Sequence, residues 1–252
     1  MAAQWLNYPE ARTPRTKDGK PNLKARAPRR YGSPDLTGVW FADRAPAEQV
    51  VEIAKLQVDV NDIGKYGANI FWDVKPEDQP LRPEAVAIMN ARKQENFPGT
   101  RCLPAGVPLG QFNDSFKMIQ TPEEIVVIDE FSDPPRQIFL DGRNLPKDPQ
   151  PTWMGYSVGK WDGETLVVET AGFNALSWLD GLGRPRSEQM RIREKYHRRD
   201  FGHMDWEITF DDPKYYTRPF TVKIGLTLIP DTNVIEFVCG ENERDAPHLG
   251  KP

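Results

Sequence analysis

Residues 155–170 read GYSVGKWDGETLVVET, and the conformation of this stretch decides the fold class. Its first five residues match the G-x-S-x-G nucleophile elbow of α/β-hydrolases, in which a serine sits on a sharp turn between a strand and a helix. The residues that follow contain Asp162-Gly163, a dipeptide typical of hairpin turns, and then a β-rich run. The stretch therefore predicts a hairpin with strands at 155–161 and 164–170, and it places Ser157 within a strand.

A catalytic triad is the alternative that the motif raises. Ser157, Asp180 and His203 follow one another in the chain order of the α/β-hydrolases. A serine in the middle of a strand lacks the exposed turn that this chemistry needs, so the hairpin context argues against the triad.

Alternation of apolar and polar residues continues on both sides of the hairpin, from about residue 115 onward. Nine segments have period two and are separated by turn residues: FKMIQ, EIVVIDE, RQIFL, GYSVGKW, ETLVVET, MRIREKYHR, MDWEITF, FTVKIGLTL and NVIEFVC. A further strand is expected at 35–43, DLTGVWFAD. Because open edges of a long meander favour aggregation, we expect about ten strands to form a single antiparallel β-barrel or clam over residues 35–252.

Two short helices and an N-terminal arm complete this mostly β fold. Apolar residues at helical spacing predict one helix within 46–60, and Pro83-Glu84 marks the start of a second. Residues 1–34 are rich in Pro, Arg and Lys and contain a degenerate repeat, PRTKDGKPNL and PRRYGSPDL. Such a segment buries too little apolar surface to fold alone, so we expect an extended arm, either solvated, docked on the domain or touching an acidic partner.

Composition argues against several classes of partner. The 252 residues carry a formal net charge of −4, which argues against a broad basic surface for nucleic acid. The longest apolar runs are too short for a membrane span. The sequence contains no phosphate loop and no dinucleotide fingerprint, so it predicts no cofactor. Cys102 and Cys239 belong to no CxxC or Cys/His cluster, so a structural zinc site has no support. The two cysteines are either a disulfide or free thiols.

Several stretches resemble known proteins. Gly38-Val39-Trp40 at the start of the first strand resembles the G-x-W opening of lipocalin and fatty-acid-binding-protein barrels. Nearly the whole chain also resembles a family of exported bacterial proteins, on the stretches QWLNYP, PDLTGVW, CLPAGVP, RQIFLDGR, PTWMGYSVGKWDGETLVVETAGF, RRDFGHM and EFVCGENE. This resemblance implies a periplasmic or extracellular location after removal of a signal peptide. It favours the Cys102–Cys239 disulfide over free thiols, and it supplies no activity.

One residue breaks the alternation in the strand MRIREKYHR. One face carries Met190, Ile192, Glu194 and Tyr196, and the other carries Arg191, Arg193, Lys195 and His197. Since the second face is solvent, the Glu194 carboxylate points inward, where desolvation raises its pKa unless it is paired. An unpaired Glu194 suits a general acid or base. A paired Glu194 is a structural ion pair, with Arg143 as the candidate partner.

Glu169 and His203 are further candidates for proton transfer. Glu169 would share a cavity with Glu194 if it faced inward, but the sequence LVVET leaves its face open. His203 lies in a turn near Asp200, which would orient its imidazole for catalysis or simply anchor the turn.

Residues of the central loop and strands are candidates for ligand binding. The loop 174–187 is long for a hairpin connection and contains Trp178 and Asp180, which suit a polar or aromatic ligand at the mouth of a barrel. A plain connector is the alternative. Trp206 belongs to a group of central tryptophans that either line a cavity or pack the core.

These residues lead to two functional hypotheses. The first is an exported enzyme, a lyase, isomerase or hydrolase without redox cofactor, that acts on a small apolar, aromatic or sugar-like substrate inside the barrel. Glu194 is then the acid or base, Tyr196 and Arg143 its polar partners, and His203 or Asp180 lies at the mouth. The second is a non-catalytic, lipocalin-type binding protein for the same class of ligand. Convergent unpaired ionisable groups favour the enzyme, and a single paired carboxylate favours the carrier. A filled barrel that binds partners through the arm is a third possibility.

Overall fold

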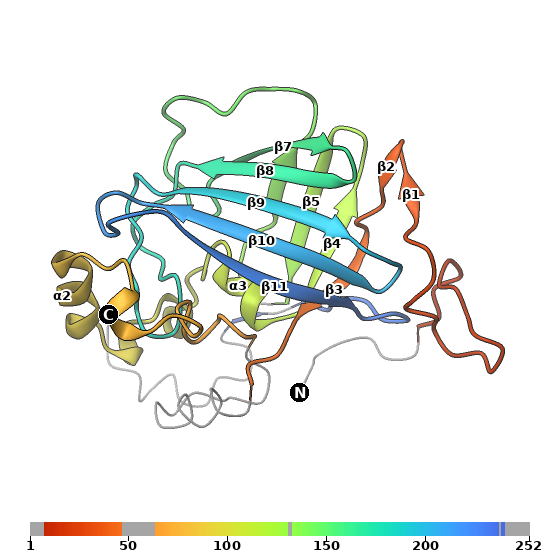
Figure 1. Cartoon of the computed structure of the whole chain (residues 1–252), viewed down its shortest axis with the longest axis horizontal. Coiled ribbons are helices and arrows are strands. Elements are labelled where there is room, and N and C mark those ends of the chain that lie inside the picture. The colour runs from red at the N-terminus through yellow and green to blue at the C-terminus, as the bar shows by residue number, and fades with distance from the viewer. Residues whose placement is uncertain (1–7, 47–63, 131–132, 237, 240–252) are drawn as a thin grey trace.

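Nine strands close into a barrel in the computed structural model of the protein, which describes residues 8–46, 64–130, 133–236 and 238–239. The strands lie in the order β10-β11-β3-β4-β5-β6-β7-β8-β9, and β9 pairs with β10 to complete the ring (Figure 1). Their bounds are β3 (Gly38–Ala42), β4 (Phe116–Gln120), β5 (Glu124–Asp129), β6 (Arg136–Phe139), β7 (Tyr156–Asp162), β8 (Thr165–Ala171), β9 (Arg191–Arg198), β10 (His203–Asp211) and β11 (Phe220–Leu228). The expected mostly β barrel is confirmed.

The barrel is mixed and not purely antiparallel, because one pair of neighbouring strands is parallel. The ladder between β6 and β7 consists of only two residue pairs, Ile138 with Ser157 and Phe139 with Val158. The chain between them, residues 140–155, is long enough to return to the same end of the barrel before the next strand starts. The other pairs of barrel strands are antiparallel, as alternation and short turns predict.

The hairpin of residues 155–170 is confirmed, with its turn one residue later than expected. β7 and β8 pair from Tyr156–Ala171 to Asp162–Thr165, so the two loop residues are Gly163 and Glu164. Gly163 has a φ of 58°, which suits a hairpin turn that carries glycine at its first central position.

The expected strand at NVIEFVC does not form in the described residues. Residues 232–236 have no regular structure, although Ile229 still donates its backbone N–H to the carbonyl of Val39. The reason is the closure of the barrel. β11 already pairs with β3 on one side and β10 on the other, so no free edge remains for a further strand.

A disulfide instead anchors the segment after β11. Cys239 is bonded to Cys102, and their Cα atoms are 5.5 Å apart. Cys102 follows the short helix η3 (Pro98–Arg101), so the bond joins the end of the described chain to a loop 137 residues earlier. The disulfide favoured by the resemblance is confirmed.

One of the two expected helices lies in the described residues. α2 (Pro83–Ala91) begins at the expected proline, whereas nearly all of the helix expected within 46–60 lies outside them. A helix that the alternation did not predict, α3 (Leu109–Asn113), interrupts the Pro/Gly-rich loop before β4, and the short helices η1 (Pro76–Asp78) and η2 (Gln94–Asn96) flank α2. No helix of the described residues is long and apolar enough to cross a membrane.

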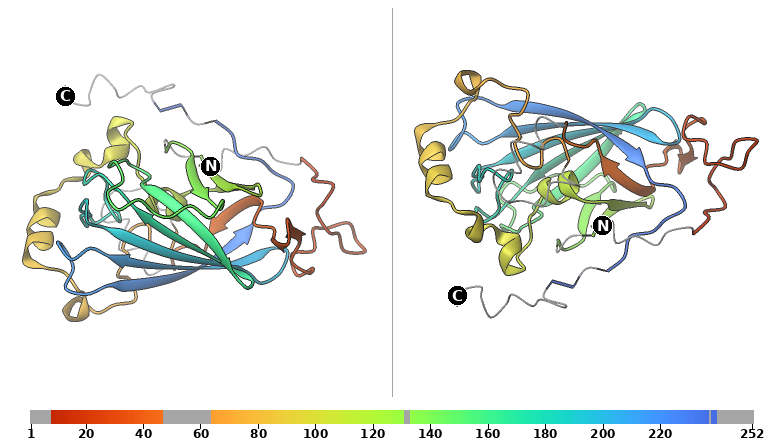
Figure 2. Two further views of the ribbon diagram at one scale, coloured as in Figure 1. Left: turned by 90° about the horizontal axis from the view of Figure 1, so that it is seen from above. Right: turned by 90° about the horizontal axis from the view of Figure 1, so that it is seen from below.

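The N-terminal arm packs against one end of the barrel, and α2 lies at the other end (Figure 1). Figure 2 shows this separation from above and below. The arm contains the small hairpin of β1 (Arg29–Arg30) and β2 (Ser33–Pro34). Phe201 and Gly202, in the turn between β9 and β10, donate their backbone N–H groups to the carbonyls of Ala25 and Leu23 at 2.8 Å. The described part of the arm is therefore docked on the domain, although many of its side chains, including those of residues 15–20, are exposed.

Aromatic side chains fill part of the barrel interior. Trp206 on β10 stacks on Tyr196 at a ring distance of 5.4 Å and contacts Phe112 of α3, also at 5.4 Å. Phe116 on β4 lies 6.2 Å from the same indole. All four rings are buried, so this part of the interior is packed core.

Gly38, at the start of β3, is a position that needs glycine. Its φ is 150°, and a Cβ atom there would overlap the Leu228 side chain of the neighbouring strand. We predict that Gly38→Ala lowers the free energy of unfolding in urea by about 1–3 kcal/mol, from backbone strain and overpacking. Gly181→Ala is the control, because its Cβ would lie 3.4 Å from the nearest atom, an ordinary contact. Equal stability of both variants would contradict the prediction.

Candidate functional site

Glu194 points into the barrel, as the alternation of its strand predicts. Exposed and buried residues alternate along β9, and Glu194 is 0% exposed. A carboxylate at this depth must be neutralised or paired. Its surroundings therefore decide whether it is available for chemistry.

The partner of Glu194 is Arg136 on β6. The Nη1 atom of Arg136 donates to Oε1 at 3.1 Å, and its Nη2 atom donates to Oε2, so the ion pair is bidentate. Arg143, the expected partner, lies on an exposed turn after β6 and bonds Asp141 and the hydroxyl of Tyr156. The position of each arginine explains the difference. Arg136 occupies an inward-facing position of β6, whereas Arg143 lies beyond the end of that strand.

The ion pair is the centre of a larger buried cluster. Tyr196 donates its hydroxyl to Glu194 Oε1 at 2.7 Å, and the Trp206 indole donates to the same oxygen at 3.2 Å. On the other side, Arg136 donates to Ser157 Oγ at 3.2 Å and to Thr170 Oγ1 at 2.9 Å. We call these residues the Arg136–Glu194 network: Arg136, Ser157, Thr170, Glu194, Tyr196 and Trp206. The network links five consecutive strands, from β6 to β10.

The charges of this network are mutually satisfied. Burial disfavours the charge on Arg136, but the adjacent Glu194 carboxylate outweighs it and raises the pKa of Arg136. Burial and the Glu194 charge raise the pKa of Tyr196 well above its usual value, so its hydroxyl remains a donor. Glu194 accepts four hydrogen bonds, three at Oε1 and one at Oε2, so both of its oxygens are engaged by groups of the protein. The carboxylate is fully buried and paired with Arg136, which does not suit proton exchange with a ligand.

Glu169 and His203 lie outside this network. Glu169 is exposed on the outer face of β8, opposite Arg193, so it does not share a cavity with Glu194. His203 lies at the start of β10, on the opposite face from Trp206. Its Nδ1 atom is 2.7 Å from Asp200 Oδ1, so Asp200 orients the ring as the sequence predicts.

The loop 174–187 is packed and does not form an open mouth. Asp180 is 0% exposed, forms an ion pair with Arg184 and accepts the backbone N–H of Ile70 at 2.9 Å. Trp178 is buried against Phe97 with a ring distance of 5.4 Å. The two candidate residues thus anchor the loop to the segment around α2.

The residues of the hypothetical triad have separate partners. Ser157 is buried within β7 and bonds Arg136 and Thr170, whereas Asp180 bonds Arg184. His203 bonds Asp200 near the arm. The hairpin geometry therefore excludes the nucleophile elbow.

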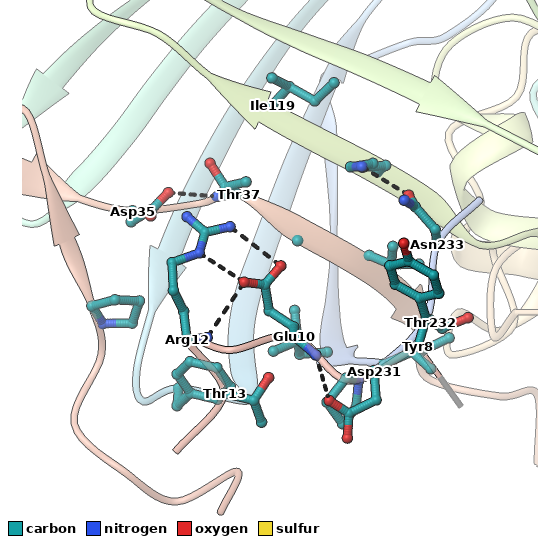
Figure 3. Close-up of a pocket in the computed structure, with 18 of the residues that line it drawn as sticks. Tyr8, Glu10, Arg12, Thr13, Asp35, Thr37, Ile119, Asp231, Thr232 and Asn233 are labelled. Atoms are coloured by element: carbon teal, nitrogen blue, oxygen red, sulfur yellow. Dashed lines mark hydrogen bonds and ion pairs between the residues drawn. The ribbon is translucent and has the colours of Figure 1, made fainter. Parts of the chain in front are cut away.

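A groove that the sequence analysis did not identify lies between the arm and the outer side of β3 and β4 (Figure 3). Its volume is about 390 Å³. It is lined by Tyr8, Glu10, Arg12, Thr13, Pro28, Asp35, Thr37, Gly38, Val39, Lys117, Ile119, Arg198, Phe201, Leu228, Ile229, Pro230, Asp231, Thr232 and Asn233. These residues come from both ends of the chain and from its middle, so no local sequence pattern reveals the groove.

Asp231 attaches the arm at the edge of the groove. Its Oδ1 atom accepts the backbone N–H of Glu10 at 3.0 Å and the Nη2 atom of Arg15 at 2.6 Å (Figure 3 shows the first bond). Its backbone carbonyl accepts the N–H of Tyr8 at 2.9 Å. Glu10 in turn forms an ion pair with Arg12, which lies over the groove. One aspartate thus holds two positions of the arm backbone.

We predict that breaking the Arg136–Glu194 pair is costly. Glu194→Gln should lower the free energy of unfolding by about 3–5 kcal/mol, because it leaves the Arg136 charge buried without its carboxylate. The double variant Arg136→Met/Glu194→Gln removes both charges and should be less destabilised than the sum of the two single variants. Urea denaturation measures all three. A Glu194→Gln protein as stable as the wild type would instead mean a carboxylate kept at the expense of stability, as the enzyme hypothesis requires.

We predict that the attachment of the arm weakens in acid. Hydrogen bonds from Arg15 lower the pKa of Asp231, and those from Arg12 lower the pKa of Glu10. A lowered pKa in the folded state means that the Arg15–Asp231 contact stabilises the docked arm above the unfolded value of about 4 and is lost as the pH falls through the lower folded value, whereas the Glu10–Arg12 pair acts within the arm. Asp231→Asn should therefore speed hydrogen exchange of the Tyr8 and Glu10 amides at pH 7.

Asp18→Asn is the matched control for Asp231→Asn, because among the described residues the Asp18 carboxylate bonds only Thr16 and Lys20, which both belong to the arm. It should leave the exchange of the Tyr8 and Glu10 amides unchanged. Equal protection in wild type and Asp231→Asn would contradict the role given to Asp231.

Comparisons with protein-family models, with curated proteins and with solved structures found no match. The architecture of the barrel, with nine strands and few helices, is consistent with a lipocalin-like fold.

Proposed function

We propose that the protein is a non-catalytic binding protein for a small ligand, which it holds in the groove between the arm and the barrel. The observation that carries this proposal is the groove itself, lined by apolar and polar side chains from five separate parts of the chain. Its volume of about 390 Å³ falls in the range of roughly 300–1,000 Å³ typical of small-molecule sites.

The surroundings of the predicted catalytic residues favour binding over catalysis. An enzyme of the kind considered above needs convergent ionisable groups that are free to exchange protons with a substrate. Glu194 is bonded on both oxygens, Asp180 is bonded to Arg184, and Glu169 faces away from the barrel interior. A single paired carboxylate inside the barrel is the arrangement that favours a carrier.

The disulfide supports an exported location. A disulfide joins Cys102 to Cys239, and disulfides persist mainly in oxidising compartments. A carrier of small molecules in the periplasm or outside the cell therefore fits the chemistry of the chain. The proposed ligand is a small molecule with an apolar part, because Val39, Ile119 and Phe201 contribute apolar surface to the groove.

A substitution that fills the groove tests this function. Ile119 is half-buried on the outer face of β4 and lines the groove, so Ile119→Trp should occupy part of its volume. We expect the neutral fluorescent probe 1-aminoanthracene to bind the wild type saturably and to bind Ile119→Trp at least tenfold more weakly, by fluorescence titration.

Val158→Trp is the matched control. Val158 is also half-buried on an outer strand face, but it lies on β7 and does not line the groove. It should bind the probe as the wild type does. No saturable binding, or equal binding by all three proteins, would overturn the proposed site.

A further inference from the structure

The charged side chains that line the groove differ in their partners: some are paired with an opposite charge and others are not. Three carboxylates line it, and each forms an ion pair with an arginine: Glu10 with Arg12, Asp231 with Arg15, and Asp35 with Arg30. Two further cations, Lys117 and Arg198, also line the groove. In the described residues, their side chains bond only neutral oxygen atoms.

Lys117 is the more accessible of these cations. It is half-buried on the outer face of β4, and its Nζ atom donates to Asn233 Oδ1 at 2.7 Å. An ammonium group has three donors, so one amide oxygen satisfies only a part of its capacity. The Lys117 charge contributes a little to the lowered pKa of the nearby Glu10 carboxyl, but Glu10 forms its ion pair with Arg12.

Arg198 provides a second positive group at the inner wall. It is only 4% exposed, its Nε atom donates to the Asp200 carbonyl at 3.2 Å, and its two Nη atoms donate to the carbonyls of Asp35 and Phe201. Burial lowers its pKa to about 10, and the Asp35 and Asp200 carboxylates offset part of this effect. In the described residues its hydrogen bonds go only to backbone carbonyls, and the guanidinium also lies over the Trp40 and Phe201 rings, so its remaining donors favour an anion.

The rest of the lining is suited to the body of a ligand. Apolar surface comes from Val39, Ile119, Phe201, Leu228 and Pro230, and hydroxyl groups come from Thr37 and Thr232. A molecule that fills the groove would therefore place an apolar, ring-sized body against these walls and an anionic group near the two cations.

We infer that the ligand of the groove is a compact monocarboxylate with an apolar body, whose carboxylate is recognised by Lys117 together with Arg198. This inference rests on the proposed function, since it names the ligand class of the same site. A monoanion is favoured over a phosphate because Glu10 and Asp231 also line the groove and repel a dianion more strongly.

A matched pair of ligands tests the inference. Naphthalene-2-carboxylate and naphthalene-2-carboxamide have the same ring and nearly the same shape, and only the first is charged. We expect the wild type to bind the carboxylate at least tenfold more tightly than the amide by isothermal titration calorimetry at low salt. Because the preference is electrostatic, it should decrease as sodium chloride is added.

Two surface variants should remove this preference. Lys117→Met deletes the ammonium group, and Asn233→Asp places a competing carboxylate on the partner of Lys117. Each should bring the carboxylate-to-amide ratio close to one and leave binding of the amide within twofold of the wild type. Lys160→Met, on the outer face of β7 and outside the groove, should keep the full preference.

The outcomes separate this inference from the proposed function. If the wild type binds neither naphthalene compound, the inferred ligand class is wrong, and the 1-aminoanthracene titration then decides whether the proposed function fails as well. If it binds the two equally, the proposed function stands and the inferred ligand class is wrong. A preference that persists in both Lys117→Met and Asn233→Asp would also overturn the inference, because the charge would then be recognised elsewhere.

Discussion

The buried ion pair between Arg136 and Glu194 is the interaction on which closure of the barrel depends. β6 and β7 are parallel and share only two residue pairs, so the backbone ladder is shortest there. Arg136 crosses this boundary by donating to Ser157 on β7 and to Glu194 on β9. An arginine buried without its carboxylate is strongly unfavourable, so the charge of Glu194 holds β6 in place beside the strands that follow it.

This arrangement gives the barrel interior a structural role. Tyr196 and Trp206 complete the hydrogen bonds of Glu194 and stack on each other, and Phe112 of α3 packs against the same indole. Little polar capacity remains there for a ligand. The outer groove differs, because its cations Lys117 and Arg198 bond neutral oxygens and its apolar side chains face a space of about 390 Å³. This contrast is the reason for proposing a ligand site outside the barrel.

Much of the fold was predictable from period-two alternation, because each strand of a one-layer barrel turns alternate residues to the core. The alternation located eight of the barrel strands from residue 115 onward, and the inward direction of Glu194 came from the same pattern. It failed at NVIEFVC, where the residues suit a strand but the closed barrel offers no edge to pair with. It also could not show that β6 and β7 are parallel, since strand direction depends on where the connection 140–155 ends.

The sequence by itself determined the class of the fold, the positions of most strands and the depth of Glu194, since these depend on residues close together in the chain. Only the tertiary structure decided that Arg136 and not Arg143 neutralises Glu194, and that the arm forms one wall of a groove. Glu10 and Asp231 are 221 residues apart, and contacts over such separations are set only when the barrel closes and brings the strands that carry them together.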